Sequence, residues 1–216
     1  MVSCSFPWGW NKHNGSPTKK VMIDAAPLTR KRVVITGHSS GIGNALLKLF
    51  QHDGFVVDGF SRTTGHNIAN PDAREKIINY ASTADIFINN AYDCEGQLIL
   101  LKEMTRLWEG TNKLIINMGS KGVHMPVLAH YEEYLHSKRQ QHDFIKSRFL
   151  KGSPRIFNVV AGLVDTQLIK HWDVKKLDVN EFAKIVYFLA MSKISVQEVM
   201  LDVDGVDWKE MFWKSQ

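Results

Sequence analysis

Tyr134 and Lys138 are four residues apart in a segment, 131–149, that is predicted to be a helix. Residues with this spacing stand on one face of a helix, so we expect the phenol and the ammonium to be neighbours. A free tyrosine has a pKa of about 10 and holds its proton too tightly to exchange it readily near neutral pH. A nearby ammonium stabilises the phenolate and lowers that pKa, which would suit Tyr134 to acid–base work such as protonating a carbonyl oxygen.

Ser120 closes a predicted strand, 113–117, that continues as Met118-Gly119-Ser120. The carboxyl ends of strands are where open α/β sheets bind ligands, so Ser120 is a candidate partner for a substrate oxygen. Other roles are open for all three residues. Tyr131 or Tyr134 could be packing residues, and Lys138 could be a solvated charge on the helix surface.

A glycine-rich turn follows the predicted strand 33–36 and leads into a predicted helix, 44–50. Its glycines, Gly37, Gly41 and Gly43, would let backbone N–H groups approach a pyrophosphate, whose negative charge the helix dipole favours. The alternative is an ordinary strand–helix turn in which glycine relieves backbone strain.

Ser61-Arg62 follows the second predicted strand, 55–60. In dinucleotide-binding folds an acid at this position binds the ribose 2′-hydroxyl, whereas an arginine accommodates a 2′-phosphate. Arg62 therefore favours NADP over NAD, unless it is simply a solvated surface residue. Asp58 is too early for this role and is interpreted as a strand residue.

The remaining segments alternate between helix and strand. Helices are predicted at 71–82, 97–108 and 180–192, and strands at 85–91, 155–160 and 196–203. Such alternation predicts an α/β protein with a Rossmann-like, doubly wound parallel sheet. We expect residues 1–30 to be an irregular leader and residues 31–216 to form a single NAD(P)-binding oxidoreductase domain.

Four motifs in this order resemble those of the short-chain dehydrogenase/reductase family. They are Thr36 with the three glycines, Asn89-Asn90-Ala91, Ser120 and Tyr134-x-x-x-Lys138, with 13 residues between Ser120 and Tyr134. The resemblance runs from about residue 33 to residue 205. The tyrosine–lysine pair alone is common by chance, whereas the four motifs in sequence are specific.

The resemblance implies hydride transfer between NADP(H) and a small carbonyl or alcohol substrate. Tyr134 would be the acid/base, Lys138 would lower its pKa and bind the nicotinamide ribose, and Ser120 would orient the carbonyl. With Tyr134 and Lys138, the cofactor-binding residues would be Gly37, Ser39, Ser40, Gly41, Ile42, Gly43, Ser61, Arg62, Asn67, Ile68, Asn90, Ala91, Gly162, Val164 and Thr166. Homodimers or homotetramers are also implied.

Some residues depart from the family pattern. Tyr92 replaces the glycine that usually follows Asn-Asn-Ala, and Ala161 replaces a proline. The family's helix asparagine, which supports a proton relay, is missing, and Asp93 or Glu95 falls nearest its place. The alternative function is therefore a dinucleotide-binding regulatory or scaffold protein with weak or no turnover. A nucleotide-sugar enzyme is disfavoured because no C-terminal sugar-binding region is evident.

The segment between Thr166 and Glu181 is expected to cover the substrate. It contains apolar and aromatic residues, Leu168, Ile169, His171 and Trp172, and three lysines assigned to solvent, Lys170, Lys175 and Lys176. A small, uncharged carbonyl substrate fits this composition.

The composition is ordinary for a soluble protein, with 44% hydrophobic and 23% charged residues and a net charge of +5 from 27 basic and 22 acidic side chains. No basic stripe with interleaved aromatics indicates nucleic acid, and no apolar run is long enough to span a membrane. Cys4 and Cys94 match no metal or redox spacing, so no metal is expected and a reducing cytoplasm is the simplest location.

Overall fold

The computed structural model describes residues 31–124 and 131–205. The expected leader, 1–30, lies outside the described residues. Six parallel strands form one sheet in the order β2-β1-β3-β4-β5-β6. The strands are β1 (Arg32–Thr36), β2 (Val56–Phe60), β3 (Ile86–Asn89), β4 (Leu114–Ser120), β5 (Arg155–Ala161) and β6 (Glu198–Leu201).

Five α-helices connect these strands: α1 (Gly41–His52), α2 (Pro71–Ala81), α3 (Gly96–Leu107), α4 (Glu132–Arg148) and α5 (Val179–Met191). Three short 3₁₀ turns, Arg62–Thr64, Lys121–His124 and Gln167–Ile169, follow β2, β4 and β5. The predicted doubly wound parallel sheet is confirmed.

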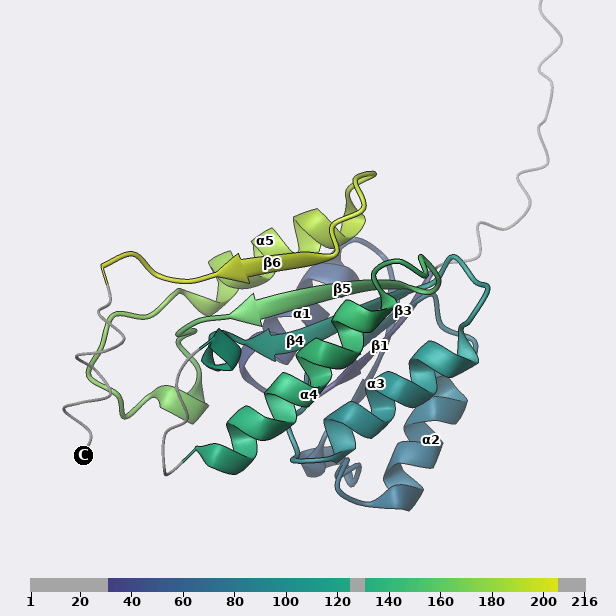
Figure 1. Ribbon diagram of the computed structural model, residues 1–216, viewed down its shortest axis with the longest axis horizontal. Helices are drawn as coiled ribbons and strands as arrows, with labels where there is room; N and C mark the ends of the chain where they lie inside the picture. The colour runs from purple at the N-terminus through teal and green to yellow at the C-terminus, as the bar shows by residue number, and fades with distance from the viewer. Residues whose placement is uncertain (1–30, 125–130, 206–216) are drawn as a thin grey trace, which may run out of the picture.

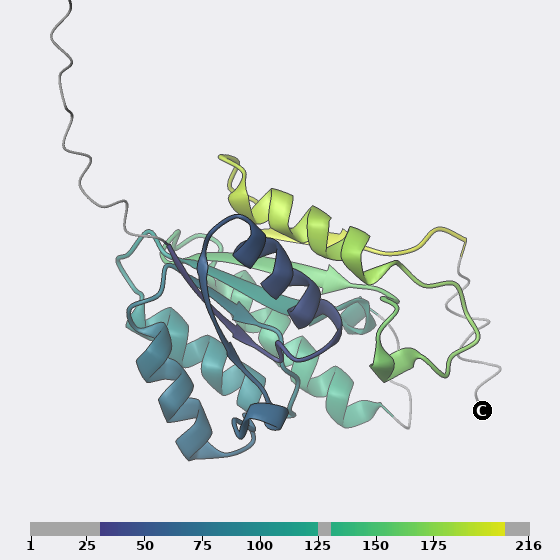
Figure 2. The same ribbon diagram turned by 180° about the vertical axis from the view of Figure 1, so that it is seen from behind.

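The helices cover both faces of the sheet. Helices α2, α3 and α4 lie on the face shown in Figure 1, and α1 and α5 lie on the face shown in Figure 2. A hydrophobic core lies on each face of the sheet, and successive strand residues point alternately into one and the other. Val33 and Ile35 pack with α1 and α5, whereas Val34 packs on the opposite side. Burial on both faces explains why the strands read as continuous apolar runs rather than as alternating ones.

The chain changes direction between β1 and β3. It leaves β1 outward to β2 and then returns to place β3 on the other side of β1, which creates a crevice at their carboxyl ends. Side chains join these two ends: Asn90 Nδ2 donates to the Thr36 carbonyl at 3.0 Å, and Thr36 Oγ1 accepts from the Asn90 backbone N–H at 3.0 Å.

Element boundaries differ modestly from the predictions. Strand β4 extends to Ser120, because Gly119 and Ser120 still pair with Val160 and Ala161 of β5. Strand β6 is shorter than predicted and ends at Leu201. A single 3₁₀ turn, Arg62–Thr64, follows β2 before the chain reaches α2.

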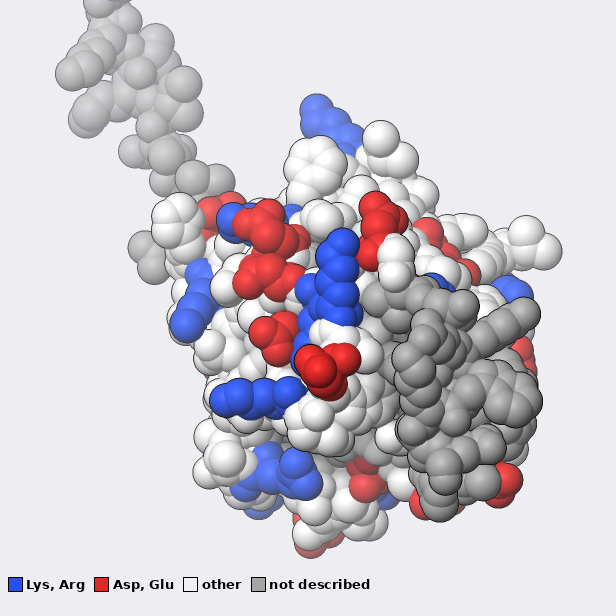
Figure 3. Space-filling view, turned by 90° about the vertical axis from the view of Figure 1, so that its left-hand side faces the viewer, with Lys and Arg blue, Asp and Glu red and all other residues white. Residues whose placement is uncertain are grey.

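Within the ranges 31–124 and 131–205, none of the helices is both long and apolar enough to cross a bilayer. The face toward which the strands' carboxyl ends point carries interspersed acidic and basic side chains wherever described residues are visible (Figure 3). This mixed charge does not form the continuous basic surface that nucleic acid binding requires.

Candidate active site

A cleft of about 910 Å³ runs along the carboxyl ends of the strands. The glycine turn after β1 borders one part of it, and Ser120, Tyr134 and Lys138 border another. Every residue predicted to bind cofactor or to act on substrate lines this cleft, with the exception of Gly43. The fold thus brings together residues that are up to about 130 positions apart in the sequence.

The glycine turn has the shape of a phosphate cradle. Gly37 and Gly41 have φ angles of 71° and 53°, which other residues rarely adopt. Gly43 lies behind the turn, where an added Cβ would stand 2.2 Å from the Gly37 carbonyl oxygen. Any other residue there would push the turn away from α1.

The helix that follows the turn leaves its first N–H groups available. Ser40, the N-cap of α1, makes no side-chain capping bond, and the first turn of α1 contains no acidic residue. These N–H groups and the helix dipole suit a diphosphate, so the residues present fit a dinucleotide.

At the far end of the cleft, the segment after β2 presents Arg62. This side chain is exposed and lines the cleft. Ser61 is buried, and its hydroxyl bonds to the hydroxyl of Thr63 at 2.8 Å, so it caps the 3₁₀ turn. Asp58 is paired with Arg32 at 2.8 Å, which agrees with its interpretation as a strand residue.

The wall beside Arg62 is formed by Asn67 and Ile68. Ile68 is buried, and Asn67 Oδ1 accepts a hydrogen bond from the Ala69 N–H at 3.2 Å. The side of the cleft predicted to face the nicotinamide is formed by the loop after β5. Thr166 lies against Gly41, with its methyl group 3.2 Å from where a Cβ on that glycine would be. Gly162 is packed against Asp202, which leaves no room for a side chain.

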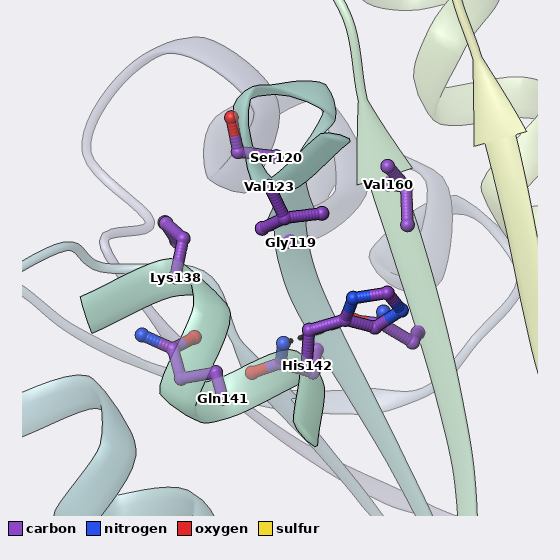
Figure 4. A pocket seen from close by; sticks show the side chains of 9 residues that line it. Gly119, Ser120, Val123, Lys138, Gln141, His142 and Val160 are labelled. Atoms are coloured by element: carbon purple, nitrogen blue, oxygen red, sulfur yellow. Dashed lines mark hydrogen bonds between the residues drawn. The ribbon is translucent and has the colours of Figure 1, made fainter. Parts of the chain in front are cut away.

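Ser120, Tyr134 and Lys138 all line this cleft, Ser120 from the end of β4 and the other two from the first turns of α4. Figure 4 shows Ser120 and Lys138 on these two elements. Ser120 lies close enough to Tyr134 for its hydroxyl to act to lower the pKa of the phenol. Lys138 Nζ lies 5.8 Å from the centre of the Tyr134 ring. The predicted trio is therefore assembled in space.

The pKa of Tyr134 is raised, not lowered as predicted. Burial of the phenol disfavours the phenolate and outweighs the lowering effect of the Ser120 hydroxyl. Lys138 does not reverse this, because burial lowers its own pKa to about 7. At neutral pH Tyr134 therefore keeps its proton, and Lys138 is only partly charged.

Two acceptors hold the buried Lys138 side chain. Its Nζ donates to Gln97 Oε1 at 2.7 Å and to the Met118 carbonyl at 2.8 Å. Gln97 is itself fully buried, and its Nε2 donates to the Asn89 carbonyl at 2.9 Å and to the Met118 carbonyl at 3.2 Å. Because both amide hydrogens face carbonyls, the amide oxygen of Gln97 must face Lys138.

The sequence analysis did not identify Gln97 and placed Asp93 or Glu95 nearest this position. That placement is wrong. Asp93 Oδ1 accepts from the Gly96 N–H at 3.0 Å and so caps α3, and Glu95 is an exposed residue at the start of the same helix. The available signal was a polar residue, Gln97, among apolar positions at the start of a helix that faces the sheet.

Three asparagines form a hydrogen-bonded row across the sheet, which we call the asparagine ladder: Asn89, Asn117 and Asn158. Asn89 Nδ2 donates to Asn117 Oδ1 at 3.0 Å, and Asn117 Nδ2 donates to Asn158 Oδ1 at 3.1 Å. Asn158 Nδ2 donates to Glu198 Oε2 at 2.8 Å. All these residues are in register on adjacent strands.

Glu198 sets the direction of the ladder, because a carboxylate accepts hydrogen bonds and does not donate them. Asn158 must turn its NH₂ group toward Glu198, and each asparagine must then present its oxygen to the previous one. At the other end Asn89 Nδ2 also donates to the Gln97 carbonyl at 2.9 Å. The ladder thus supports Gln97 and, through it, Lys138.

Aromatic rings crowd the substrate side of the cleft. Tyr92 packs edge-on against Tyr134, with the ring centres 4.9 Å apart. Its side chain is 41% exposed, and burial of its hydroxyl region raises its pKa. His136, two residues after Tyr134, is exposed and bonds to Gln140 at 3.0 Å.

No protein-family model and no curated protein matches this sequence. Solved structures do match. A 3-alpha-hydroxysteroid dehydrogenase from a Pseudomonas species, complexed with NADH, superimposes with a TM-score of 0.66, at 18% identity over 79% of this chain and 94% of that chain. The chain has the fold of the short-chain dehydrogenase/reductases.

Two further members with this short-chain dehydrogenase/reductase fold illustrate the similarity. A short-chain dehydrogenase from Burkholderia cenocepacia in complex with NADP gives a TM-score of 0.66, at 17% identity over 84% of this chain and 91% of that chain. A 3-ketoacyl-(acyl-carrier-protein) reductase from Brucella melitensis complexed with NADH gives 0.65, at 17% identity over 80% of this chain and 96% of that chain.

Proposed function

We propose that this protein is an NADP(H)-dependent oxidoreductase that interconverts a small, uncharged carbonyl compound and its alcohol. The observation that carries the proposal is the meeting of Tyr134, Lys138 and Ser120 in the cleft that the glycine turn also borders. Proteins with this fold and a bound NADH or NADP are dehydrogenases and reductases, which supports the reaction class.

Each residue of the trio has a defined task in the direction of reduction. A nicotinamide cofactor, when bound in the cleft, would supply the hydride. Tyr134 gives its proton to the carbonyl oxygen, and its raised pKa keeps that proton available at neutral pH. Ser120 donates a hydrogen bond to the same oxygen, and the charged form of Lys138 stabilises the resulting phenolate.

The choice of NADP rests on Arg62, because the matching structures include complexes with NADH as well as NADP. Arg62 is exposed at the cleft, and no carboxylate is among the described residues that line it. An acid there would repel a 2′-phosphate, whereas the guanidinium attracts it.

The test is a comparison of the wild type with Tyr134→Phe. We expect NADPH oxidation with a neutral ketone, followed by absorbance, to be lost in the variant while NADPH affinity is nearly unchanged, because only the hydroxyl is removed. Phe188→Tyr, which alters an exposed ring on α5, is the matched control and should retain activity. Retention of most of the rate in Tyr134→Phe would overturn the assignment.

A second candidate function is dinucleotide binding with weak or no turnover. The observation that favours it is the burial of Lys138, which lowers its pKa to about 7 and leaves this lysine partly uncharged near neutral pH. Tight NADPH binding by a wild type that reduces none of a broad panel of carbonyl compounds would support this candidate instead.

A further inference from the structure

We propose that the substrate side of the cleft selects a carbonyl compound that carries an uncharged aromatic ring, and that Trp172 and Tyr131 determine this selection. The inference rests on the proposed function and names the substrate class of the same site.

Aromatic rings from three separate segments border this side of the cleft. Tyr92 follows β3, Tyr131 and Tyr134 begin α4, and Trp172 follows the 3₁₀ turn after β5. Tyr131 packs edge-on against Trp172, with ring centres 6.2 Å apart and an interplanar angle of 82°. This is the geometry that aromatic rings prefer, and it fixes the two rings relative to each other.

These rings pack against one another but remain partly exposed in the cleft, where a ligand can contact them. Tyr131 is 39% exposed and Tyr92 is 41% exposed, and both line the cleft that contains Tyr134. A substrate whose carbonyl oxygen reaches Tyr134 and Ser120 therefore extends past tyrosine and tryptophan rings. A flat aromatic ring can stack on them or meet their edges with complementary quadrupoles, whereas a puckered saturated ring offers only C–H contacts.

The charges around this side favour an uncharged ring. Arg62 and Lys138 are the charged side chains among the described residues that line the cleft. Lys138 is held by Gln97 and Met118, and Arg62 lies beside Ser61, at the cofactor end. Apart from His171, whose ring centre lies 6.2 Å from that of Trp172, an anionic group beside Trp172 would find no basic side chain among these lining residues.

The three lysines near Trp172 do not alter this conclusion. Lys170 is exposed and does not line the cleft. Lys175 Nζ donates to the Asp204 carbonyl at 3.2 Å, and Lys176 Nζ donates to the Trp172 carbonyl. The sequence analysis assigned these lysines to solvent, and none of the three lines the cleft.

The experiment compares two ketones with the same carbon count and chain length, 4-phenylbutan-2-one and 4-cyclohexylbutan-2-one. Their carbonyl groups are electronically alike, because two methylene groups separate each from its ring. The cyclohexyl compound is at least as hydrophobic, so greater apolar burial alone cannot favour the phenyl compound. We expect kcat/KM with NADPH to be about two- to tenfold higher for the phenyl compound, as one or two ring contacts would give.

Trp172→Leu should remove this preference, and Tyr131→Leu is a second variant in case the first fails to fold. Phe188→Leu removes an exposed ring that does not line the cleft, so it should keep the preference. Binding of each ketone to the NADPH complex, measured by saturation-transfer NMR, gives a readout that does not need turnover.

Equal rates for the two ketones, or a preference for the cyclohexyl compound, would overturn the inference and leave the proposed oxidoreductase function intact. So would a preference that survives both Trp172→Leu and Tyr131→Leu. If neither ketone is reduced or bound, the inference is also overturned, and NADPH binding together with turnover of other carbonyl compounds then decides the proposed function separately.

Discussion

Lys138 Nζ lies 2.7 Å from Gln97 Oε1, in a region where both side chains are buried. An amide oxygen stabilises an ammonium less than a carboxylate does, and burial lowers the pKa of Lys138 to about 7. Burial thus sets the charge of Lys138 in the presence of a neutral partner, and a charged partner would change it. A lysine with a pKa of about 7 can gain or lose a proton near neutral pH.

Gln97→Glu should raise the pKa of Lys138 by about 1–3 units, because an opposite charge within hydrogen-bond reach favours the ammonium. The measurement is an NMR titration of ¹³C-labelled lysine in the cofactor-free protein. Gln140→Glu adds the same carboxylate at an exposed position of α4 and is the control. An unchanged Lys138 titration in Gln97→Glu would show that the 2.7 Å contact does not set its charge.

Stability should increase as the pH rises from about 7 toward 10.5, through Lys138. The pKa of this lysine is about 7 in the folded chain and 10.5 ordinarily, so between these values the unfolded chain binds more protons. The free energy of unfolding then rises with pH, by at most about 1.4 kcal/mol per pH unit. Below pH 7 both states are protonated and this contribution is constant.

Urea unfolding at pH 6, 7.5 and 9 measures this effect. Lys138→Met lacks the titrating group, so the difference in unfolding free energy between wild type and variant should move in favour of the wild type as the pH rises. Lys48→Met, at an exposed position of α1, should follow the wild type throughout. Parallel curves for wild type and Lys138→Met would contradict a lowered pKa for Lys138.

NADPH should bind more tightly than NADH, because Arg62 can form a charge-assisted hydrogen bond to the 2′-phosphate. Such a bond contributes about 1.5–3 kcal/mol, or roughly ten- to a hundredfold in affinity, and the exposure of Arg62 favours the lower value. Arg62→Gln should remove most of this difference by weakening NADPH and sparing NADH. Fluorescence titration measures both constants, and Lys76→Gln, an exposed charge on α2, is the control.

Equal dissociation constants for the two cofactors in the wild type would remove the case for NADP. The same conclusion would follow if Arg62→Gln weakened NADPH and NADH equally, since that would indicate a structural effect of the substitution.

Local sequence patterns predicted the fold and most of the cleft. The strand 33–36 is determined by its own apolar residues, and the turn after it by glycines with positive φ angles, Gly37 and Gly41. Both features depend only on residues close together in the sequence. The contact between Gln97 and Lys138 could not be predicted in this way. It depends on how α3 and α4 pack against each other, and the two residues are 41 positions apart. The raised pKa of Tyr134 likewise depends on burial, which no motif specifies.

The asparagine ladder was missed for a related reason. Asn89 belonged to a recognised motif, but its partners Asn117 and Asn158 lie in ordinary apolar strands. Only the register of β3, β4 and β5 places the three side chains opposite one another. Glu198 gains its role in the same way, from its position beside Asn158 on β6.

Asn117→Asp tests the direction of the ladder with almost no change in shape. The substitution replaces the NH₂ group that donates to Asn158 Oδ1 at 3.1 Å with an oxygen, so two acceptors would face each other in a fully buried position. The loss of one hydrogen bond and the burial of an unpaired charge should lower the free energy of unfolding by about 2–4 kcal/mol. Part of this loss should be regained at acidic pH, where the new carboxyl carries a proton and can donate again.

Asn79→Asp, at an exposed position of α2, makes the same chemical change without a buried partner and should stay within about 0.5 kcal/mol of the wild type. Equal stability of the two variants in chemical unfolding would mean that the ladder can reverse its amide groups, and that Glu198 does not fix their direction.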